Sequence, residues 1–214
     1  MMHLFEAMLA LHEATGSPIA LEGARSIGNF VTRRLLRGTA DGGAYIAEWY
    51  DAKWEPLRTK EEGGYIDLGH QFEWAYLLDA AAYQGVSGIY EAVAERVLNY
   101  AIKTGYDELA GGTFQAVYPD GTIAREKGYW QQSECLRTLM RFAVLYGKKD
   151  LWRRYEQTLE LVKDEFIDTA NGGWRLSAKS ACERSACADV QPDAYHMTAM
   201  HQEALALSKR SRQR

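Results

Sequence analysis

Apolar residues recur at three- and four-residue steps along most of the chain, the spacing of amphipathic helices. This spacing predicts about seven helices, over residues 2–15, 19–37, 68–84, 87–106, 130–146, 149–167 and 192–208. Gly16, Gly85 and Gly147 each follow one of these runs, where a glycine commonly ends a helix in the left-handed conformation. Another helix begins a few residues after each glycine, so the sequence predicts three helical hairpins.

A double glycine follows the second helix of each hairpin. It occurs in DGGAYI (41–46), AGGTFQAVY (110–118) and NGGWRL (171–176), each time before a short extended segment with an aromatic residue. Gly42, Gly111 and Gly172 are 69 and 61 residues apart, so a unit of helix, turn, helix, glycine pair and strand recurs. VYPDGTIA (117–124) carries the Asp-Gly turn of a β-hairpin.

Helical hairpins must stack, because one hairpin cannot bury its inner face alone. About three and a half units are present, whereas a closed double ring of inner and outer helices has about six. We therefore predict an all-α fold over residues 1–208, an incomplete toroid of helical hairpins with short β-hairpins at one end. Its open edges would expose apolar faces, so self-association through these edges is expected. The basic residues 209–214 are expected to form a solvated tail.

Composition narrows the choice of partner. A formal net charge of −4 without a basic stripe argues against nucleic acid. No apolar run approaches the ~20 residues that span a bilayer, and the first residues lack the basic character of a signal peptide, so a cytoplasmic protein is expected. The 6 Trp and 13 Tyr residues favour a pocket for flat, weakly polar ligands such as sugars.

The sequence lacks the motifs of several classes of enzyme and metal-binding protein. Cys135, Cys182 and Cys187 have no paired spacing, which predicts ordinary thiols. HExxH is absent, and His-x-x-Glu reverses the Glu-x-x-His order of carboxylate-bridged metal bundles, so neither a metal nor another cofactor is expected. P-loop, GxGxxG and GxSxG motifs are also absent, which leaves nucleotide and acyl-serine chemistry without support.

Polar groups gather at the starts of four predicted helices. In GHQFEWAYLL (69–78), His70, Glu73 and Trp74 share one helical face near the start. MHLFEA (2–7) repeats the spacing with His3 and Glu6. Two later segments continue the pattern: YWQQSECL (129–136) with Trp130 and Glu134, and PDAYHMTAM (192–200) with His196. One such pair alone favours helix capping, but four together favour a shared cavity. His12 and His201 are predicted to be surface or packing groups.

Taken together, these segments resemble the N-acylglucosamine 2-epimerase family, which includes mannose isomerases and cellobiose 2-epimerases. GHQFEWAYLL, MHLFEAMLALHEATG, DELAGGTFQAVYPDGT, KGYWQQSECLRTL and YHMTAMHQEAL carry the resemblance, in the family's order, over residues 1–208. It implies an (α/α)6 barrel, present as its C-terminal half to two-thirds, and interconversion of sugars at C1 and C2 without a redox cofactor.

The resemblance also implies roles for particular residues. His70 corresponds to the histidine that moves the proton beside the sugar carbonyl, Glu73 to its supporting carboxylate, and His196 to the second acid/base or ring-opening group. Gln131 stands where a proline is common in the family, a departure that concerns backbone stiffness. Substrate contacts are expected from His3, Glu6, Trp74, Trp130 and Glu134.

The proposed chemistry suits these residue types. Removing a proton next to an aldehyde needs a base that is neutral at working pH, as imidazole is. Returning the proton from a cis-enediol to C1 gives a ketose, and delivering it to the other face of C2 gives an epimer.

Two alternatives stay open at this stage. Glu73 and Glu134 could be the paired carboxylates of a glycoside hydrolase on a similar toroid, or the chain could be a non-catalytic helical-repeat scaffold whose histidines only cap helices.

Overall fold

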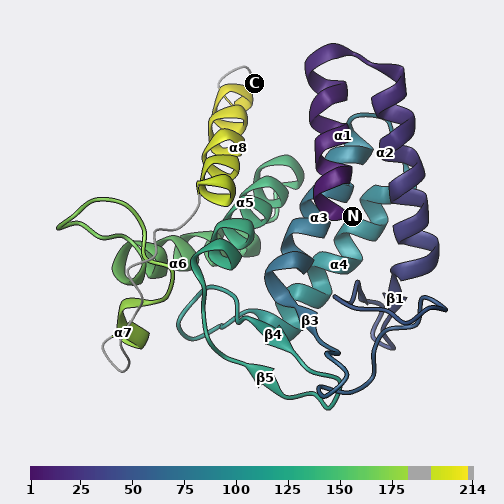
Figure 1. Ribbon diagram of the computed structural model, residues 1–214. Helices are drawn as coiled ribbons and strands as arrows, with labels where there is room; N and C mark the ends of the chain where they lie inside the picture. Colours follow the sequence, from purple (N-terminus) through teal and green to yellow (C-terminus); the bar gives the residue numbers. More distant parts are fainter. Residues whose placement is uncertain (183–193, 212–214) are drawn as a thin grey trace. The chain divides into compact units, whose positions relative to one another are not determined.

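The computed structural model describes residues 1–182 and 194–211, shown in Figure 1. Two compact units divide these residues. The first contains Met1–Thr104 and Val117–Thr122, and the second contains the other described residues from Gly105 onward. Cys187 lies outside the described residues and the side chain of Cys182 is not described, so their prediction as ordinary thiols applies here only to the buried, free thiol of Cys135.

The first unit begins with a helical hairpin, α1 (Met2–Thr15) and α2 (Pro18–Phe30). Gly16 ends α1 in the left-handed conformation, with φ 68°. Ser17 then caps α2 by accepting a hydrogen bond from the Ala20 N–H. The hairpin packs its buried side of α1 against α3 (Leu68–Tyr83), and α4 (Ile89–Gly105) follows in the chain.

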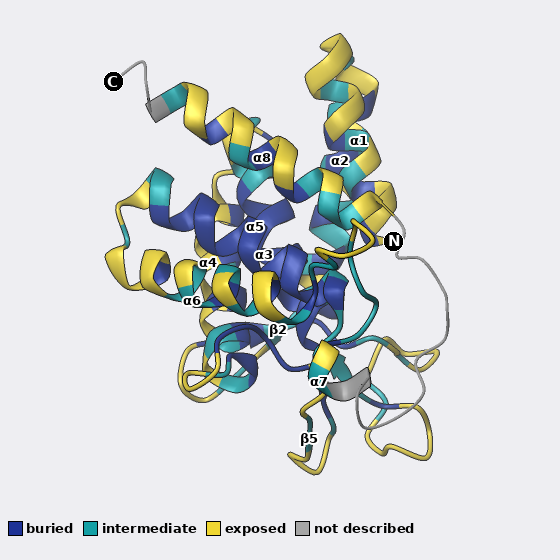
Figure 2. Cartoon of the chain, turned by 90° about the vertical axis from the view of Figure 1, so that its left-hand side faces the viewer, coloured by how far each residue is buried: buried dark blue, intermediate teal, exposed yellow. Residues whose placement is uncertain are grey.

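The second unit is built around α5 (Tyr129–Tyr146), which packs against both α6 (Lys149–Glu165) and α8 (Tyr195–Ser211). A four-residue helix, α7 (Lys179–Cys182), follows α6. The core of this unit is formed by buried side chains from these helices, among them Leu136, Val162, Phe166 and Met200. Figure 2 shows α3 and α5 each buried along most of their length, as helices at the inside of a hairpin stack should be.

Strands are short and lie between the helices. β1 (Arg37–Gly38) and β2 (Ala44–Tyr45) pair antiparallel with Arg37 opposite Tyr45. β3 (Ile66–Asp67) leads directly into α3. β4 (Ala116–Val117) and β5 (Ile123–Ala124) are the arms of the predicted hairpin, whose Asp-Gly turn is closed by the Tyr118 N–H bonding to the Thr122 carbonyl at 2.9 Å.

Each glycine pair closes a turn, and the second and third turns have the same length. The Asp107 and Asp168 N–H groups bond to the carbonyls of Gly112 and Gly173, five residues on, at 2.8 and 2.9 Å. The first turn is one residue shorter, because the Thr39 N–H bonds to the Gly43 carbonyl, four residues on, at 3.0 Å. The repeat read from the sequence is therefore present, with one residue less in its first turn. Gly111 shows why glycine is needed here. Its φ is +76°, and a Cβ would lie 2.7 Å from the Gln157 carbonyl oxygen.

A buried glutamine fastens the segment after two of these turns to the following helix. Gln71 in α3 accepts from the Ile46 N–H at 2.9 Å and donates to the Ile46 carbonyl at 2.8 Å. Gln132 in α5 does the same with Thr113, at 2.8 and 2.9 Å. We call these two residues the glutamine clamps. Each replaces a strand partner by a side chain, so a lone extended segment keeps its backbone hydrogen bonds satisfied.

The all-α prediction is confirmed, and the predicted helices match the observed ones to within about three residues at most ends. The predicted 19–37 helix departs most: after Phe30 it becomes a π-helical turn, η1 (Val31–Leu35), closed by the Leu36 N–H bonding to Val31. The last helix starts at Tyr195 and runs to Ser211, into the segment predicted as a tail. Among the described residues, no helix is long and apolar enough to cross a membrane.

Candidate functional site

His70 lies in the first turn of α3, where two carboxylates hold it. Asp67 is the N-cap of the helix, and its carboxylate accepts from the His70 backbone N–H at 3.1 Å. On the ring, Nδ1 of His70 lies 2.6 Å from Oε1 of Glu48. Because an ionised carboxylate can only accept, Nδ1 is the donor in this contact.

Asp67 is buried, and this desolvation raises the pKa of its carboxyl from 3.8 to about 6. The folded chain therefore holds this proton more tightly than the unfolded chain does. Stability from this group is fully present below about pH 4 and is lost as the pH rises to about 6, because the ionised form must be kept in a buried position.

Asp67→Asn should remove this pH dependence while keeping a residue able to cap the helix. One pKa unit corresponds to about 1.4 kcal/mol. The difference in unfolding free energy, wild type minus Asp67→Asn, should therefore fall by roughly 2–3 kcal/mol as the pH rises from 4 to 7. Urea unfolding of both proteins at several pH values measures this difference, in which the titration of all other groups cancels. A difference that does not change with pH would contradict the prediction.

The first unit also brings together His3, Glu6 and Glu73. Nδ1 of His3 lies 3.6 Å from Glu73 and 3.9 Å from Glu6, and the Glu73 side chain is fully buried whereas that of His3 is 62% exposed. Glu48 thus lies at the His70 Nδ1 atom, and Glu73 lies beside His3. The predicted support of His70 by Glu73 stays a prediction.

Trp74 is buried and packs within the first unit. Its ring centre lies 6.0 Å from that of Phe5 in α1, and only 5% of the residue is exposed. The ring therefore contributes to the packing of α3 on α1, and its predicted role as a sugar-stacking surface stays a prediction.

His3, Glu6 and Glu73 also have the donor types for a cation, with ligand atoms within 4.8 Å of one another. An exposed imidazole between two carboxylates is equally an ordinary ion-pair cluster.

His196 in the second unit is held in the same way as His70. Its Nδ1 lies 2.9 Å from Oε1 of the fully buried Glu134, whose other oxygen lies 3.4 Å from Arg137. The Trp130 ring lies 5.1 Å from the imidazole, tilted by 31°, and the Tyr195 ring meets the imidazole edge-on at 4.7 Å. Trp130, Glu134 and His196, predicted separately from two segments, therefore form one cluster.

The other two histidines serve the backbone, in keeping with their prediction as packing or surface groups. Nδ1 of His12 lies 3.0 Å from the Ser17 carbonyl at the end of the first hairpin turn. His201 is exposed, and its Nδ1 lies 2.7 Å from the Met197 carbonyl one turn earlier.

Glu48 is the site residue that the sequence reasoning missed. It lies in an irregular segment 22 residues before His70, so no helical spacing connects the two. A local signal was present, because Glu48 lies two residues after the glycine-pair segment DGGAYI (41–46).

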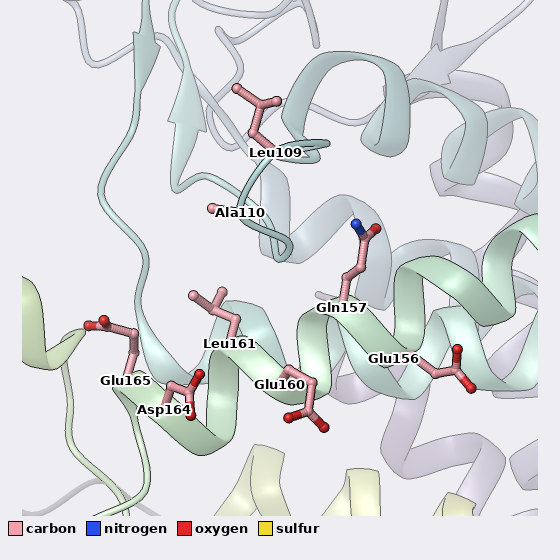
Figure 3. A pocket seen from close by; sticks show the side chains of 8 residues that line it. All are labelled: Leu109, Ala110, Glu156, Gln157, Glu160, Leu161, Asp164 and Glu165. Atoms are coloured by element: carbon pink, nitrogen blue, oxygen red, sulfur yellow. The ribbon is translucent and has the colours of Figure 1, made fainter.

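A separate cavity of about 440 Å³ lies against the exposed side of α6 (Figure 3). Leu109, Ala110 and Leu161 form its apolar part, and its other lining residues are mostly acidic: Glu156, Gln157, Glu160, Asp164 and Glu165. It contains no predicted site residue, and its acidic rim is an ordinary solvated helix face.

Comparison with known proteins places this geometry in a family. Residues 1–199 match the N-acylglucosamine 2-epimerase (GlcNAc 2-epimerase) family. The chain is similar to a D-mannose isomerase of Thermobifida fusca. The two are 27% identical over an aligned length of 215 residues, gaps included, which covers 91% of this chain and 51% of the relative. It spans about half the length of the curated relatives that it matches.

Solved structures share the fold. A crystal structure of a D-mannose isomerase superposes with a TM-score of 0.78 at 21% identity, covering 96% of this chain and 55% of the other. A cellobiose 2-epimerase from Spirochaeta thermophila superposes with a TM-score of 0.74 at 16% identity, over 97% of this chain and 51% of the other. These likenesses support the (α/α)6 class of fold. With a family match over nearly the whole chain, this protein belongs to the N-acylglucosamine 2-epimerase family.

Proposed function

We propose that the chain acts as a sugar isomerase or epimerase, moving a proton between C1 and C2 of an aldose with His70 as the base. The observation that carries the proposal is the Nδ1 contact of His70 with Glu48, at 2.6 Å. With Nδ1 as the donor to Glu48, Nε2 of the partly exposed imidazole is the nitrogen that we propose accepts the proton. Membership of the family supports this reaction class over glycoside hydrolysis and over a non-catalytic scaffold.

The reaction needs no redox change. His70 Nε2 takes the proton from C2 of the open-chain aldose, and the electrons of the C–H bond form the C1–C2 double bond of a cis-enediol while O1 gains a proton. Return of the carbon proton to C1, with loss of the O2 proton as C2=O forms, gives a ketose. Delivery of a proton to the opposite face of C2, with loss of the O1 proton as C1=O forms again, gives the 2-epimer. A positioned base contributes roughly 10²–10⁴-fold, so further donors must stabilise the developing oxyanion.

His196 is the proposed second acid/base, because its Nδ1 contacts the buried Glu134 carboxylate at 2.9 Å, as that of His70 contacts Glu48. The partly exposed Trp130 beside it offers an apolar ring face to a sugar. His3, Glu6, Trp74 and Glu134 remain proposed substrate contacts, and Glu73 remains a proposed catalytic carboxylate. A mannose-type aldose–ketose isomerase is the preferred form, since mannose isomerases recur among the similar proteins.

Hydrogen exchange with solvent tests the proposal. The protein is incubated in D₂O with mannose, cellobiose or N-acetylglucosamine, and NMR follows deuterium at C1 and C2 together with any ketose or epimer. We expect deuterium incorporation with at least one of these sugars, and none with methyl α-mannoside, whose locked C1 cannot open to an aldehyde. Absence of exchange with all three sugars would overturn the proposal, and release of reducing sugar from a glycoside would favour a hydrolase.

A further inference from the structure

The segment that carries Glu48 is fixed to α3 from both sides. The clamp residue Gln71, itself fully buried, holds both backbone polar groups of Ile46. The Glu48 N–H bonds to the Tyr65 carbonyl at 3.1 Å, which pairs the segment with the chain just before α3. The backbone of Glu48 is therefore held by hydrogen bonds to α3 and to its entrance.

Tyr50 adds a third attachment, this time to the first hairpin. Its hydroxyl accepts from the Ala47 N–H at 2.8 Å and donates to the Leu35 carbonyl at 2.9 Å. Burial raises the pKa of Tyr50 to about 12, so the hydroxyl keeps the proton that this arrangement needs. The residues on either side of Glu48 are thus immobilised independently of its own side chain.

The other partner, His70, is fixed equally well. Its backbone N–H is taken by the Asp67 cap, and it belongs to the first turn of a buried helix. Two backbones held by hydrogen bonds are therefore joined by the Glu48–His70 contact, and both side chains are only partly exposed, 25% for His70 and 19% for Glu48. Such preorganisation is what a site needs to hold an imidazole in one tautomer and one orientation.

We propose that Glu48 is the positioning residue of His70: its carboxylate keeps the proton on Nδ1 and so keeps Nε2 unprotonated and aimed for proton transfer. The catalytic part of this inference rests on the proposed function of His70 as the base. The tautomer of the His70 ring is a property of the protein without substrate and can be measured independently. Glu48 acts through His70 and does not itself touch the sugar. An orienting carboxylate of this kind selects the tautomer and stabilises the imidazolium that forms during reaction.

The direct test is the tautomer of His70, read by NMR of protein carrying ¹⁵N-labelled histidine at a pH where the ring is neutral. The shifts of Nδ1 and Nε2 distinguish the protonated from the unprotonated nitrogen, and His70→Asn identifies the His70 signals. We expect the Nδ1–H tautomer in wild type, its loss in Glu48→Ala, and its retention in Glu48→Gln, whose amide oxygen still accepts. Glu61→Gln, on an exposed glutamate of the same irregular segment, is the matched control and should leave the signals unchanged.

Activity gives the second readout. Glu48→Ala should lower kcat by about 10²-fold or more and change KM by less than about threefold. The reason is that the His70 ring loses the group that fixes its tautomer and orientation, while the residues that contact the sugar are unchanged. An Nε2–H tautomer in wild type, or an Nδ1–H tautomer that survives in Glu48→Ala, would overturn the inference whatever the activities. If wild type exchanges no hydrogen with any sugar, the proposed function fails, and the NMR experiment still decides the role of Glu48.

Discussion

His70→Asn is expected to lower the rate of sugar interconversion by roughly 10²–10⁴-fold, the contribution of a positioned general base. The amide nitrogen of asparagine can take the place of Nδ1 as a hydrogen-bond donor, and asparagine suits the first turn of a helix. It has no basic nitrogen that can accept the C2 proton. The loss should appear in kcat and in the rate of deuterium uptake from D₂O, with little change in the melting temperature.

The matched control is His201→Asn, which replaces an exposed histidine whose ring serves only a backbone carbonyl in its own helix. Its activity should equal that of wild type. If His70→Asn retained more than about a tenth of the wild-type kcat, His70 could not be the base. An equal loss in both variants would instead indicate damage to the fold.

Gln71→Leu should cause the largest loss of stability, about 2–5 kcal/mol. Leucine has a similar volume, so the packing of α3 is kept, but the N–H and C=O groups of Ile46 lose their partners in a buried place. Each unpaired buried group costs about 1–3 kcal/mol. The same change at Gln132, which clamps Thr113, should cost a similar amount because its bonds are equivalent.

Urea unfolding measures both losses, with Gln202→Leu as control. Gln202 lies on the exposed side of α8, so its replacement should change the unfolding free energy by less than about 0.5 kcal/mol. If Gln71→Leu lowered the unfolding free energy as little as the control, the hydrogen bonds of Gln71 to Ile46 would not be what stabilises this segment.

The helices and the repeat could be predicted because they depend on local rules. Apolar spacing and the cap glycines placed α1, α3 and α5 within about a residue of their observed ends. The turn at the glycine pair recurs because Gly111 and its counterparts occupy conformations that other residues rarely adopt. The π-helical turn at Val31–Leu35 has no comparable local signal, so a plain helix was predicted there.

Site residues were predictable only where they lie on helices. Glu73 was chosen as the partner of His70 because the two are three residues apart, yet that spacing says nothing about where Nδ1 points. Glu48 reaches the ring from an irregular segment, and its position is set by long-range hydrogen bonds that only the folded chain reveals. In the same way Gln71 and Gln132 read as unremarkable polar residues of a helix until their backbone partners are known.

The glutamine clamps have one more consequence, for how such a chain can vary. Each clamp glutamine binds only main-chain atoms of the clamped residue, so that residue can be isoleucine in one repeat and threonine in the other. Two residues beyond each clamped position the chain carries Glu48 in one repeat and Gln115 in the other. The attachment and the functional group are therefore separable, and substitutions beside a clamp can give one repeat a new chemical task without disturbing the frame that both repeats share.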